Sequence, residues 1–413
     1  MRETSSRLLP TVLVLLLSIL LSPYLSSWFP MAGGMPIGSI VRQLAFMAVF
    51  FMALPVGGGA TEPELKRLLQ IFAFNCVFTV VSFIHGPSTL PQFAAGVASF
   101  VFYPVLFLFM AMGLRTVSPL EKRRFYTFFD KFCVRMFLIL PIIGVLDVIL
   151  EGNLILALGY NPNYGGEDFF LITSYNDTVR ANAGIGDALA FGYLMVVGVI
   201  YFLSRKNRVG FNINGLGLGL CTLAAVLSLT RGAMIAMFIV YLIFFFSPRR
   251  LLLLLAAGLL LFALLYNSPY NELLLGRFTD SDEASETSSL LRLVMALNSI
   301  DFLAENPMGI GIGTQGSGST LSDDSIRLNT DNYFFHIFLE LGVAFGAWFI
   351  FFLYKQFAYA ARRVGSGKIV AAYVVLFVVS AALSSSIAFA TLGGFFWFTL
   401  YLFVLKSEVY VEN

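Results

Sequence analysis

The sequence predicts an all-α polytopic integral membrane protein with about twelve transmembrane helices. Of its 413 residues, 58% are hydrophobic and only 12% are charged, whereas an ordinary soluble domain is about 25% charged. Apolar runs of roughly 17–25 residues, the length that crosses a ~30 Å hydrocarbon core, recur along almost the whole chain. The net charge of +2 and the lack of a basic tail give no reason to expect nucleic acid as a partner. We therefore expect residues 1–413 to form a single transmembrane domain.

The predicted spans follow one another along the chain. They cover residues 8–28, 37–56, 68–84, 93–114, 132–150, 185–204, 211–229, 232–247, 251–266, 332–354, 369–390 and 392–406. The first run is longer than the apolar part of a typical signal peptide and has no clear cleavage site, so we count it as a spanning helix. Cys76, Cys133 and Cys221 lie inside apolar runs, which favours buried inert thiols over a disulfide framework or a metal site.

Basic residues in the connections predict the orientation. With the N-terminus inside, the connections at 64–67, 115–124, 205–208, 248–250 and 355–368 are cytoplasmic. All but six of the 26 basic residues then lie on the cytoplasmic side. Because Lys and Arg favour cytoplasmic loops, we expect both termini in the cytoplasm.

The six exceptions are all arginine and lie on or near the outer side. They are Arg42, Arg180, Arg231, Arg277, Arg292 and Arg327. The planar guanidinium group binds phosphate oxygens bidentately, whereas lysine offers a point charge. An unpaired charge inside an apolar helix costs on the order of 2.5–3.5 kcal/mol. Two interpretations stay open: a cation cluster facing an anionic substrate, or snorkelling and pairing with Asp147, Asp187 or Glu340.

Two outer connections exceed the roughly 12–15 residues beyond which loops are usually functional or disordered. They cover 151–184 and 267–331. The second contains apolar residues at helical spacing: Leu290, Leu293, Val294, Leu297, Ile300 and Leu303. Thr287, Ser288 and Ser289 precede them as caps, and Pro307 follows as a stop. This pattern predicts an amphipathic helix lying along the membrane surface.

A literal GxGxxG follows that helix, from Gly311 to Gly316. The dinucleotide fingerprint has this meaning only after a buried strand and within a βαβ unit, and neither pattern is present here. Two interpretations remain: a flexible turn that lets the backbone approach another element, or a nest of backbone amides for phosphate oxygens.

Four segments resemble those of the O-antigen ligase and polymerase superfamily. They are "SLTRGAMIA" (228–236), "SSLLRLVMALNSIDFLAENPMGIGIGT" (288–314), "DNYFFHIFLELGVAFG" (331–346) and "RANAGIGDALAFG" (180–192). Their order and their expected convergence on one membrane face carry the resemblance, which spans about 180–346. It implies a GT-C-like multi-span fold in the bacterial inner membrane with a periplasmic active site. It also implies glycan donors linked to undecaprenyl diphosphate.

The resemblance implies which cations bind the diphosphate. Arg231 and Arg292 match the arginines of the family motifs, and Arg180 is a third candidate, whereas Arg42, Arg277 and Arg327 are weaker ones. Cations stabilise the charge that develops on a leaving diphosphate, so no metal, ATP or other cofactor is expected. The DxD at Asp280–Asp282 lies in a Ser/Asp/Glu-rich loop and does not indicate a metal.

The acceptor hydroxyl needs a base that takes its proton. Ligases of this superfamily typically carry histidine before the asparagine of the helix-start motif, whereas this chain carries Asp331 and Asn332, with His336 one turn later. Asp331 and His336 are the predicted catalytic residues, and Asn332 and Glu340 are secondary candidates. The structural alternatives are a helix cap for Asp331 and local packing for His336 and Glu340.

The departure from histidine favours a polymerase over a ligase. A polymerase joins lipid-linked repeat units into O-antigen, capsule or exopolysaccharide, whereas a ligase transfers the glycan to lipid A core. A transporter is the alternative from another class, but no convincing internal repeat of the kind carriers show is present. A receptor or scaffold is a third alternative, but the sequence contains no sizeable soluble domain to support it. Expected partners are the lipid-linked donor and acceptor, the bilayer and a chain-length regulator.

Overall fold

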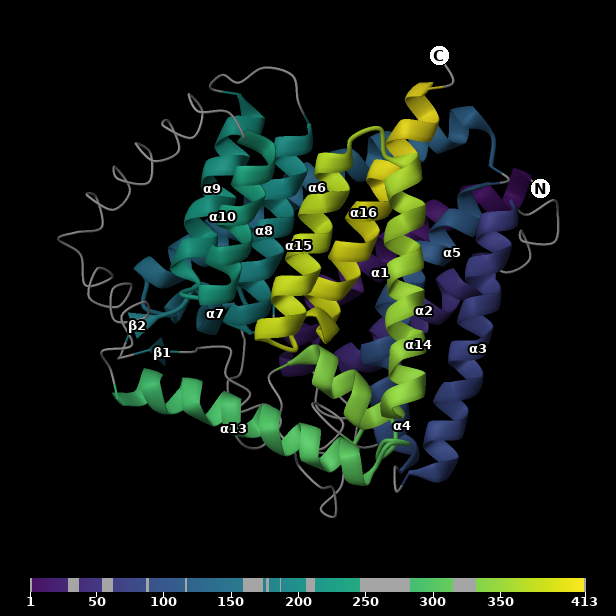
Figure 1. Ribbon diagram of the computed structural model, residues 1–413. Coiled ribbons are helices and arrows are strands. Elements are labelled where there is room, and N and C mark those ends of the chain that lie inside the picture. The colour runs from purple at the N-terminus through teal and green to yellow at the C-terminus, as the bar shows by residue number, and fades with distance from the viewer. Residues whose placement is uncertain are drawn as a thin grey trace.

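The computed structural model describes residues 2–28, 37–53, 62–86, 89–115, 117–158, 174–175, 178–185, 187–205, 212–245, 283–314 and 332–411. Most of these residues are helical, and most helices lie side by side in one bundle (Figure 1). The helices are α1 (Arg2–Trp28), α2 (Ile37–Ala53), α3 (Pro63–His85), α4 (Leu90–Val97), α5 (Tyr103–Arg115), α6 (Pro119–Ile149), α7 (Asn153–Ala157), α8 (Ala188–Ser204), α9 (Ile213–Leu227), α10 (Arg231–Phe245), α13 (Glu283–Glu305), α14 (Tyr333–Arg363), α15 (Gly367–Leu383) and α16 (Ala390–Val411). A π-helical segment (Ala98–Phe102) joins α4 to α5, and a 3-10 turn (Ser386–Ala388) precedes α16.

The helices confirm the prediction of an all-α polytopic membrane protein. In the described part of the chain, six helical stretches are long and apolar enough to cross a membrane: α1, α3, α4–α5, α6, α14 and α16. Shorter apolar helices are α2, α8, α9, α10 and α15. Each predicted span therefore has a described helix except the one at 251–266, which lies outside the described residues.

α6 and α14 extend furthest beyond their predicted spans because capping and helix-forming residues continue past the apolar run. α6 begins at Pro119, well before the expected start at 132, where the Ser118 side chain accepts a hydrogen bond from the Glu121 backbone. α14 continues to Arg363 instead of ending near 354. Most residues of the expected cytoplasmic connections at 115–124 and 355–368 are thus helical.

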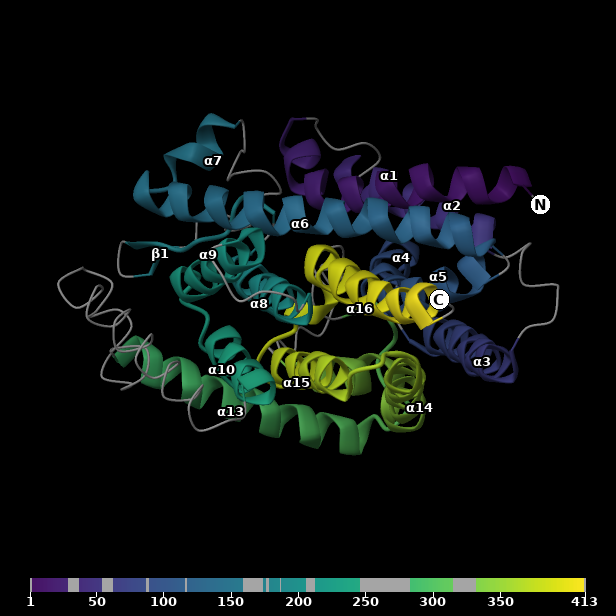
Figure 2. The same ribbon diagram turned by 90° about the horizontal axis from the view of Figure 1, so that it is seen from above.

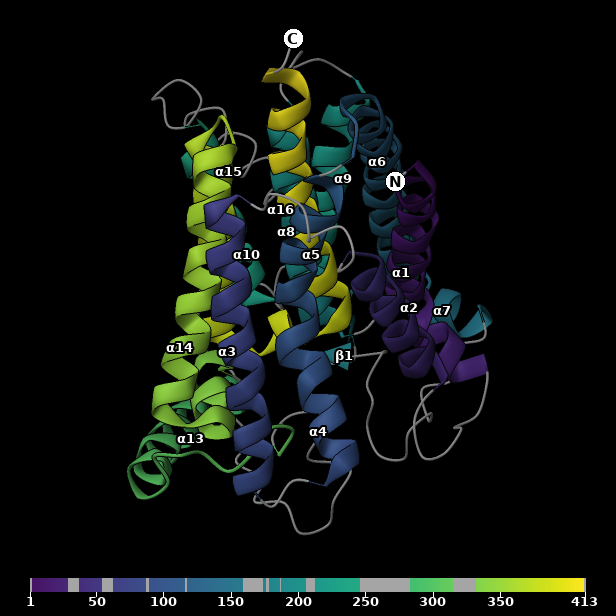
Figure 3. The same ribbon diagram turned by 90° about the vertical axis from the view of Figure 1, so that its right-hand side faces the viewer.

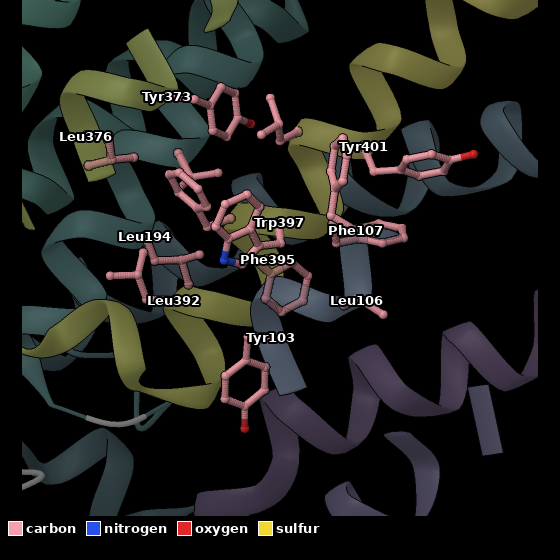
Figure 4. Packing of buried hydrophobic residues seen from close by; sticks show 14 of the residues in the cluster. Tyr103, Leu106, Phe107, Leu194, Tyr373, Leu376, Leu392, Phe395, Trp397 and Tyr401 are labelled. Carbon is pink, nitrogen blue, oxygen red and sulfur yellow. The ribbon is translucent and has the colours of Figure 1, made fainter. Parts of the chain in front are cut away.

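α16 lies at the centre of the bundle. It packs against α1, α5, α6, α8 and α14, and Figure 2 shows these neighbours around it. Figure 4 shows the aromatic core that results, with Trp397 and Tyr401 of α16 facing Phe107 of α5. The ring centroids of Phe107 lie 6.2 Å from Trp397 and 5.8 Å from Tyr401. Because lipid tails are as apolar as these side chains, such close packing contributes much of what holds helices together in a bilayer.

The two long connections contribute structure at the end of the bundle opposite the chain termini (Figures 1 and 3). The connection at 151–184 forms α7 and two short antiparallel strands, β1 (Ser174–Tyr175) and β2 (Thr178–Val179), which the sequence analysis did not predict. Ser174 is the register partner of Val179, and Tyr175 that of Thr178.

A helix is present within 267–331 as predicted: it is α13, which crosses this end of the bundle (Figure 1). It begins at Glu283, so the expected caps at Thr287, Ser288 and Ser289 lie inside the helix. Val294, Leu297 and Ile300 are 43%, 53% and 51% exposed. The predicted apolar stripe therefore points away from the bundle over these residues.

Candidate functional site

The first cluster of the candidate site is the turn between α9 and α10, Ser228–Arg231, which we call the arginine turn. α9 ends at Leu227 and α10 begins at Arg231. Leu229 has φ 51°, a left-handed conformation that is unusual for a bulky residue. Such strained residues persist only where their surroundings hold them, and they gather at functional sites.

Arg180 holds the arginine turn from a distant part of the sequence. Its Nε donates to the Ser228 carbonyl oxygen at 2.8 Å and its Nη2 donates to Thr230 Oγ1 at 3.1 Å. The Thr230 hydroxyl in turn donates to the Ala188 carbonyl at the start of α8, at 3.2 Å. Only 9% of Arg180 is exposed. The structure thus brings Arg180 next to the residue that precedes Arg231.

The segment 180–185 is buried and is anchored by other helices. The Tyr24 hydroxyl of α1 donates to the Ala183 carbonyl at 3.2 Å, and the Thr391 hydroxyl of α16 donates to the Ile185 carbonyl at 2.8 Å. Asn182 is fully buried, and its Oδ1 accepts from the Gly184 amide at 2.8 Å.

Asn182 is a polar residue of this cluster that the sequence analysis missed. Its Nδ2 is buried and has no hydrogen-bond partner among the described residues. A buried donor without a partner costs about 1–3 kcal/mol and calls for an explanation. One sequence signal could have identified Asn182: it is an amide between two small apolar residues, two positions after Arg180.

The second cluster begins where α14 starts. Asn332 is the N-cap of this helix: its Oδ1 accepts from the Phe334 and Phe335 amides at 2.9 and 3.2 Å. Its Nδ2 donates to the Ala382 carbonyl near the end of α15 at 3.0 Å. Asn332 therefore caps α14 and fastens it to α15.

His336 and Glu340 form a buried pair one turn further along α14. The distance from His336 Nε2 to Glu340 Oε1 is 3.1 Å, and the two residues are 5% and 0% exposed. Glu340 Oε2 accepts from the Gly313 backbone amide at 2.9 Å. With Glu340 ionised, Nε2 carries the proton and donates it, which assigns the acceptor role to Nδ1. The edge of Phe100 packs on the imidazole with centroids 4.8 Å apart.

The glycine-rich segment Pro307–Gly313, which we call the glycine clamp, holds a break in α14. Gly342 has φ 78° and ψ 173°, which interrupts the helix. The Val343 amide donates to the Pro307 carbonyl at 2.9 Å, and the Ile310 amide donates to the Leu339 carbonyl at 2.9 Å. Irregular backbone at membrane depth is tolerated only where the protein supplies such partners.

Close backbone contact explains the glycines of the clamp. A Cβ at Gly309 would lie 2.8 Å from the Glu340 carbonyl oxygen, and a Cβ at Gly342 would lie 2.6 Å from the Met308 carbonyl oxygen. The structure therefore shows the first of the two predicted interpretations, close approach of the backbone to another element. The Gly313 amide binds the internal carboxylate of Glu340. Gly316 lies outside the described residues.

We expect Gly309→Ala to lower the free energy of unfolding by about 1–3 kcal/mol. Gly309 has φ 78°, and the added Cβ also meets α14 at its break. The measurement is the unfolding temperature of the purified protein in detergent. Gly367→Ala is the matched control because no atom lies within 4 Å of a Cβ at Gly367. Equal unfolding temperatures for the two variants would contradict the role of the clamp.

Both clusters contact the end of α15. Asn332 binds the Ala382 carbonyl, and Leu383 Cδ1 lies 3.3 Å from the position of a Cβ at Gly232, the residue after Arg231. Both clusters therefore lie at the end of the bundle that α13 crosses (Figure 1).

The remaining predicted residues do not join this group. Arg42 lies on α2 and donates to the hydroxyls of Ser22 at 3.1 Å and Ser39 at 3.4 Å. Asp147, one of its expected partners, instead accepts from the Ile155 amide at 3.0 Å. Residues outside the described part of the chain are Asp331, Arg277, Arg327 and the DxD at 280–282; Arg292 lies in α13, but its side chain is also outside. Within the described residues, no group of His, Cys, Asp and Glu has the arrangement of a metal site.

Comparisons with known proteins identify the family of the chain. A family model described as O-antigen ligase matches residues 216–350, a range that contains the arginine turn, the glycine clamp and the His336–Glu340 pair. The chain is 33% identical over 392 residues to a protein of Salmonella muenchen described as an O-antigen polymerase. That similarity covers 89% of this chain and 96% of the relative. The chain therefore belongs to the O-antigen ligase and polymerase family.

Proposed function

We propose that this protein is a membrane glycosyltransferase that polymerises lipid-diphosphate-linked oligosaccharide repeat units into a surface polysaccharide. The observation that carries the proposal is the arginine turn, where buried Arg180 binds Ser228 and Thr230, and Thr230 directly precedes Arg231 at one end of a membrane bundle. The similarity to an O-antigen polymerase over most of the chain supports polymerisation. The Asp331–Asn332 helix start, in place of the histidine typical of ligases, supports it as well.

Arg231 is the main candidate for binding the diphosphate of the donor. It is the first residue of α10, where the helix dipole also favours an anion. We assign Arg292 of α13 and Arg180 as further contacts to undecaprenyl diphosphate. Arg180 has a second role in this proposal, because its bonds to Ser228 and Thr230 fix the turn from which Arg231 projects.

The reaction is a displacement at the anomeric carbon of the donor glycan. The hydroxyl oxygen of the acceptor repeat unit forms the new glycosidic bond, while the bond from the anomeric carbon to the diphosphate oxygen breaks. The electron pair leaves with the lipid diphosphate, whose growing charge the arginines stabilise. The hydroxyl proton passes to the protein base. No metal, ATP or other cofactor takes part in this scheme.

His336 and Asp331 are the candidates for that base. His336 is held in one orientation by Glu340, which leaves Nδ1 as a fixed proton acceptor in a site screened from bulk water. Asp331 directly precedes the cap of the same helix in the sequence. Glu340 acts through His336 in this scheme and is a positioning residue.

We place the reaction on the periplasmic face of the bacterial inner membrane, with both termini in the cytoplasm. The basic residues of the connections support this orientation. A chain-length regulator is the expected protein partner.

The test is the surface polysaccharide of a strain that lacks the gene, complemented with wild type or with Arg231→Ala and sized on a gel. Polymerase function predicts single repeat units on lipid A core in the deletion strain, with long chains restored by wild type but not by Arg231→Ala. Ligase function, which the matched family description supports, predicts long lipid-linked chains that accumulate without reaching lipid A core. Repeat units trapped on the cytoplasmic side would indicate a transporter.

A further inference from the structure

A cavity of about 370 Å³ opens between α3 and α14, away from both clusters of the candidate site. It lies where α3 begins and α14 ends, towards the end of the bundle that carries the chain termini (Figure 3). Its walls carry cations near that end and aromatic side chains deeper in the bundle. We call it the α3–α14 groove.

The polar part of the groove has an excess of positive charge. Arg67, Lys355 and Arg362 line it together with a single acid, Glu64. Glu64 forms an ion pair with Arg362. Among the described residues, neither Arg67 nor Lys355 has an ion pair. The groove therefore presents two cations without a carboxylate partner.

The deeper part of the groove is apolar and exposed. Phe74 and Phe351 line it and are 55% and 38% exposed. Trp348 closes its base by donating from Nε1 to the Ile71 carbonyl on α3 at 3.3 Å. From Arg362 to Trp348, α14 rises by about 21 Å at ~1.5 Å per residue. The groove is thus longer than one leaflet of a ~30 Å hydrocarbon core.

We propose that the α3–α14 groove binds one anionic phospholipid. The phosphate lies between Arg67 and Lys355, and an acyl chain runs along Phe74 towards Trp348. The apolar base distinguishes this site from one for a free anion, because a soluble phosphate leaves those aromatic side chains uncovered. The predicted orientation places the cations at the cytoplasmic leaflet, where anionic lipids attract basic residues.

A lipid in this groove bridges the helix pair that supports the second cluster. At the other end of α3, the Ser82 hydroxyl donates to the Glu340 backbone carbonyl at 2.9 Å. The bound lipid therefore braces α3 against α14, the helix that carries His336 and Glu340. Lipid binding itself is independent of the reaction proposed for those residues.

The test is native mass spectrometry of the purified full chain with phosphatidylglycerol or phosphatidylcholine. We expect wild type to retain phosphatidylglycerol in preference to phosphatidylcholine, and Arg67→Gln/Lys355→Gln to retain it roughly tenfold less. Arg124→Gln/Lys131→Gln is the control, because it removes the same two charges from exposed positions on α6. It is expected to bind like wild type.

A second variant, Ala358→Trp, fills the groove without changing its charge, because Ala358 lines the cavity. It is also expected to lose phosphatidylglycerol, and size-exclusion profiles confirm that each variant is folded. Three results would overturn the proposal. They are equal retention of phosphatidylglycerol by the two double variants, full retention of it by Ala358→Trp, and binding of phosphatidylcholine by wild type as strong as that of phosphatidylglycerol. Displacement of the lipid by millimolar inorganic phosphate would identify a free-anion site and overturn it as well.

Discussion

Arg231→Ala is expected to reduce the rate of chain elongation by roughly 10²–10³-fold, the usual loss when one donor to a developing negative charge is removed. Arg231 is the first residue of α10 and follows Thr230, which Arg180 binds, and in the proposed reaction it stabilises the charge that grows as the diphosphate leaves. Arg231→Lys keeps the charge but loses the planar fork that binds two oxygens, so we expect only partial activity. The measurement is the initial rate of elongation by purified variants.

Arg180→Ala provides the informative comparison. Because Arg180 binds Ser228 and Thr230, its loss should lower both the elongation rate and the unfolding temperature. Arg231→Ala should lower the rate with a smaller change in unfolding temperature. Arg123→Ala, at an exposed position on α6, is the control for loss of a positive charge. Wild-type elongation by folded Arg231→Ala would show that this arginine is structural.

His336→Gln is expected to reduce elongation by roughly 10²–10⁴-fold, the contribution of a positioned general base. Glu340→Gln should have a smaller effect. Its amide oxygen can still accept from the Gly313 backbone, but the neutral side chain no longer fixes His336 as a proton acceptor at Nδ1. The same elongation assay measures both variants, and the unfolding temperature separates loss of catalysis from loss of the fold.

Asp331→Asn distinguishes the two candidate bases. Loss of elongation in Asp331→Asn, together with near-normal elongation in a folded His336→Gln protein, would assign the base to Asp331. In that case the His336–Glu340 pair only supports the start of α14. Loss in His336→Gln alone would assign the base to the buried histidine.

The helices could be predicted because their signals are local in the sequence. Apolar run length located α8, α9 and α10 closely. The start of α6 also had a readable signal, Ser118 followed by Pro119, but a search for apolar runs alone passed over it. The break in α14 was missed because Gly342 lies inside the span predicted at 332–354, and only its contact with Met308 shows why glycine is required there.

The site was only partly predictable because its geometry depends on contacts between distant residues. Motif resemblance selected Arg180 and Arg231, but the bonds from Arg180 to Ser228 and Thr230 join positions about fifty residues apart. His336 and Glu340 were candidates from the sequence, whereas neither their pairing nor the bond between Glu340 and the Gly313 amide was predicted. Asn182 was missed because an amide between two alanines is a weak signal until its burial is known.

The most direct test of the central claim is elongation by the purified protein in lipid vesicles, supplied only with a lipid-diphosphate-linked repeat unit. The account predicts a ladder of longer lipid-linked glycans, one released lipid diphosphate per new glycosidic bond, and loss of both products in Arg231→Ala. A protein that forms no product longer than one repeat unit, yet transfers that unit to added lipid A core, would contradict polymerisation and identify a ligase.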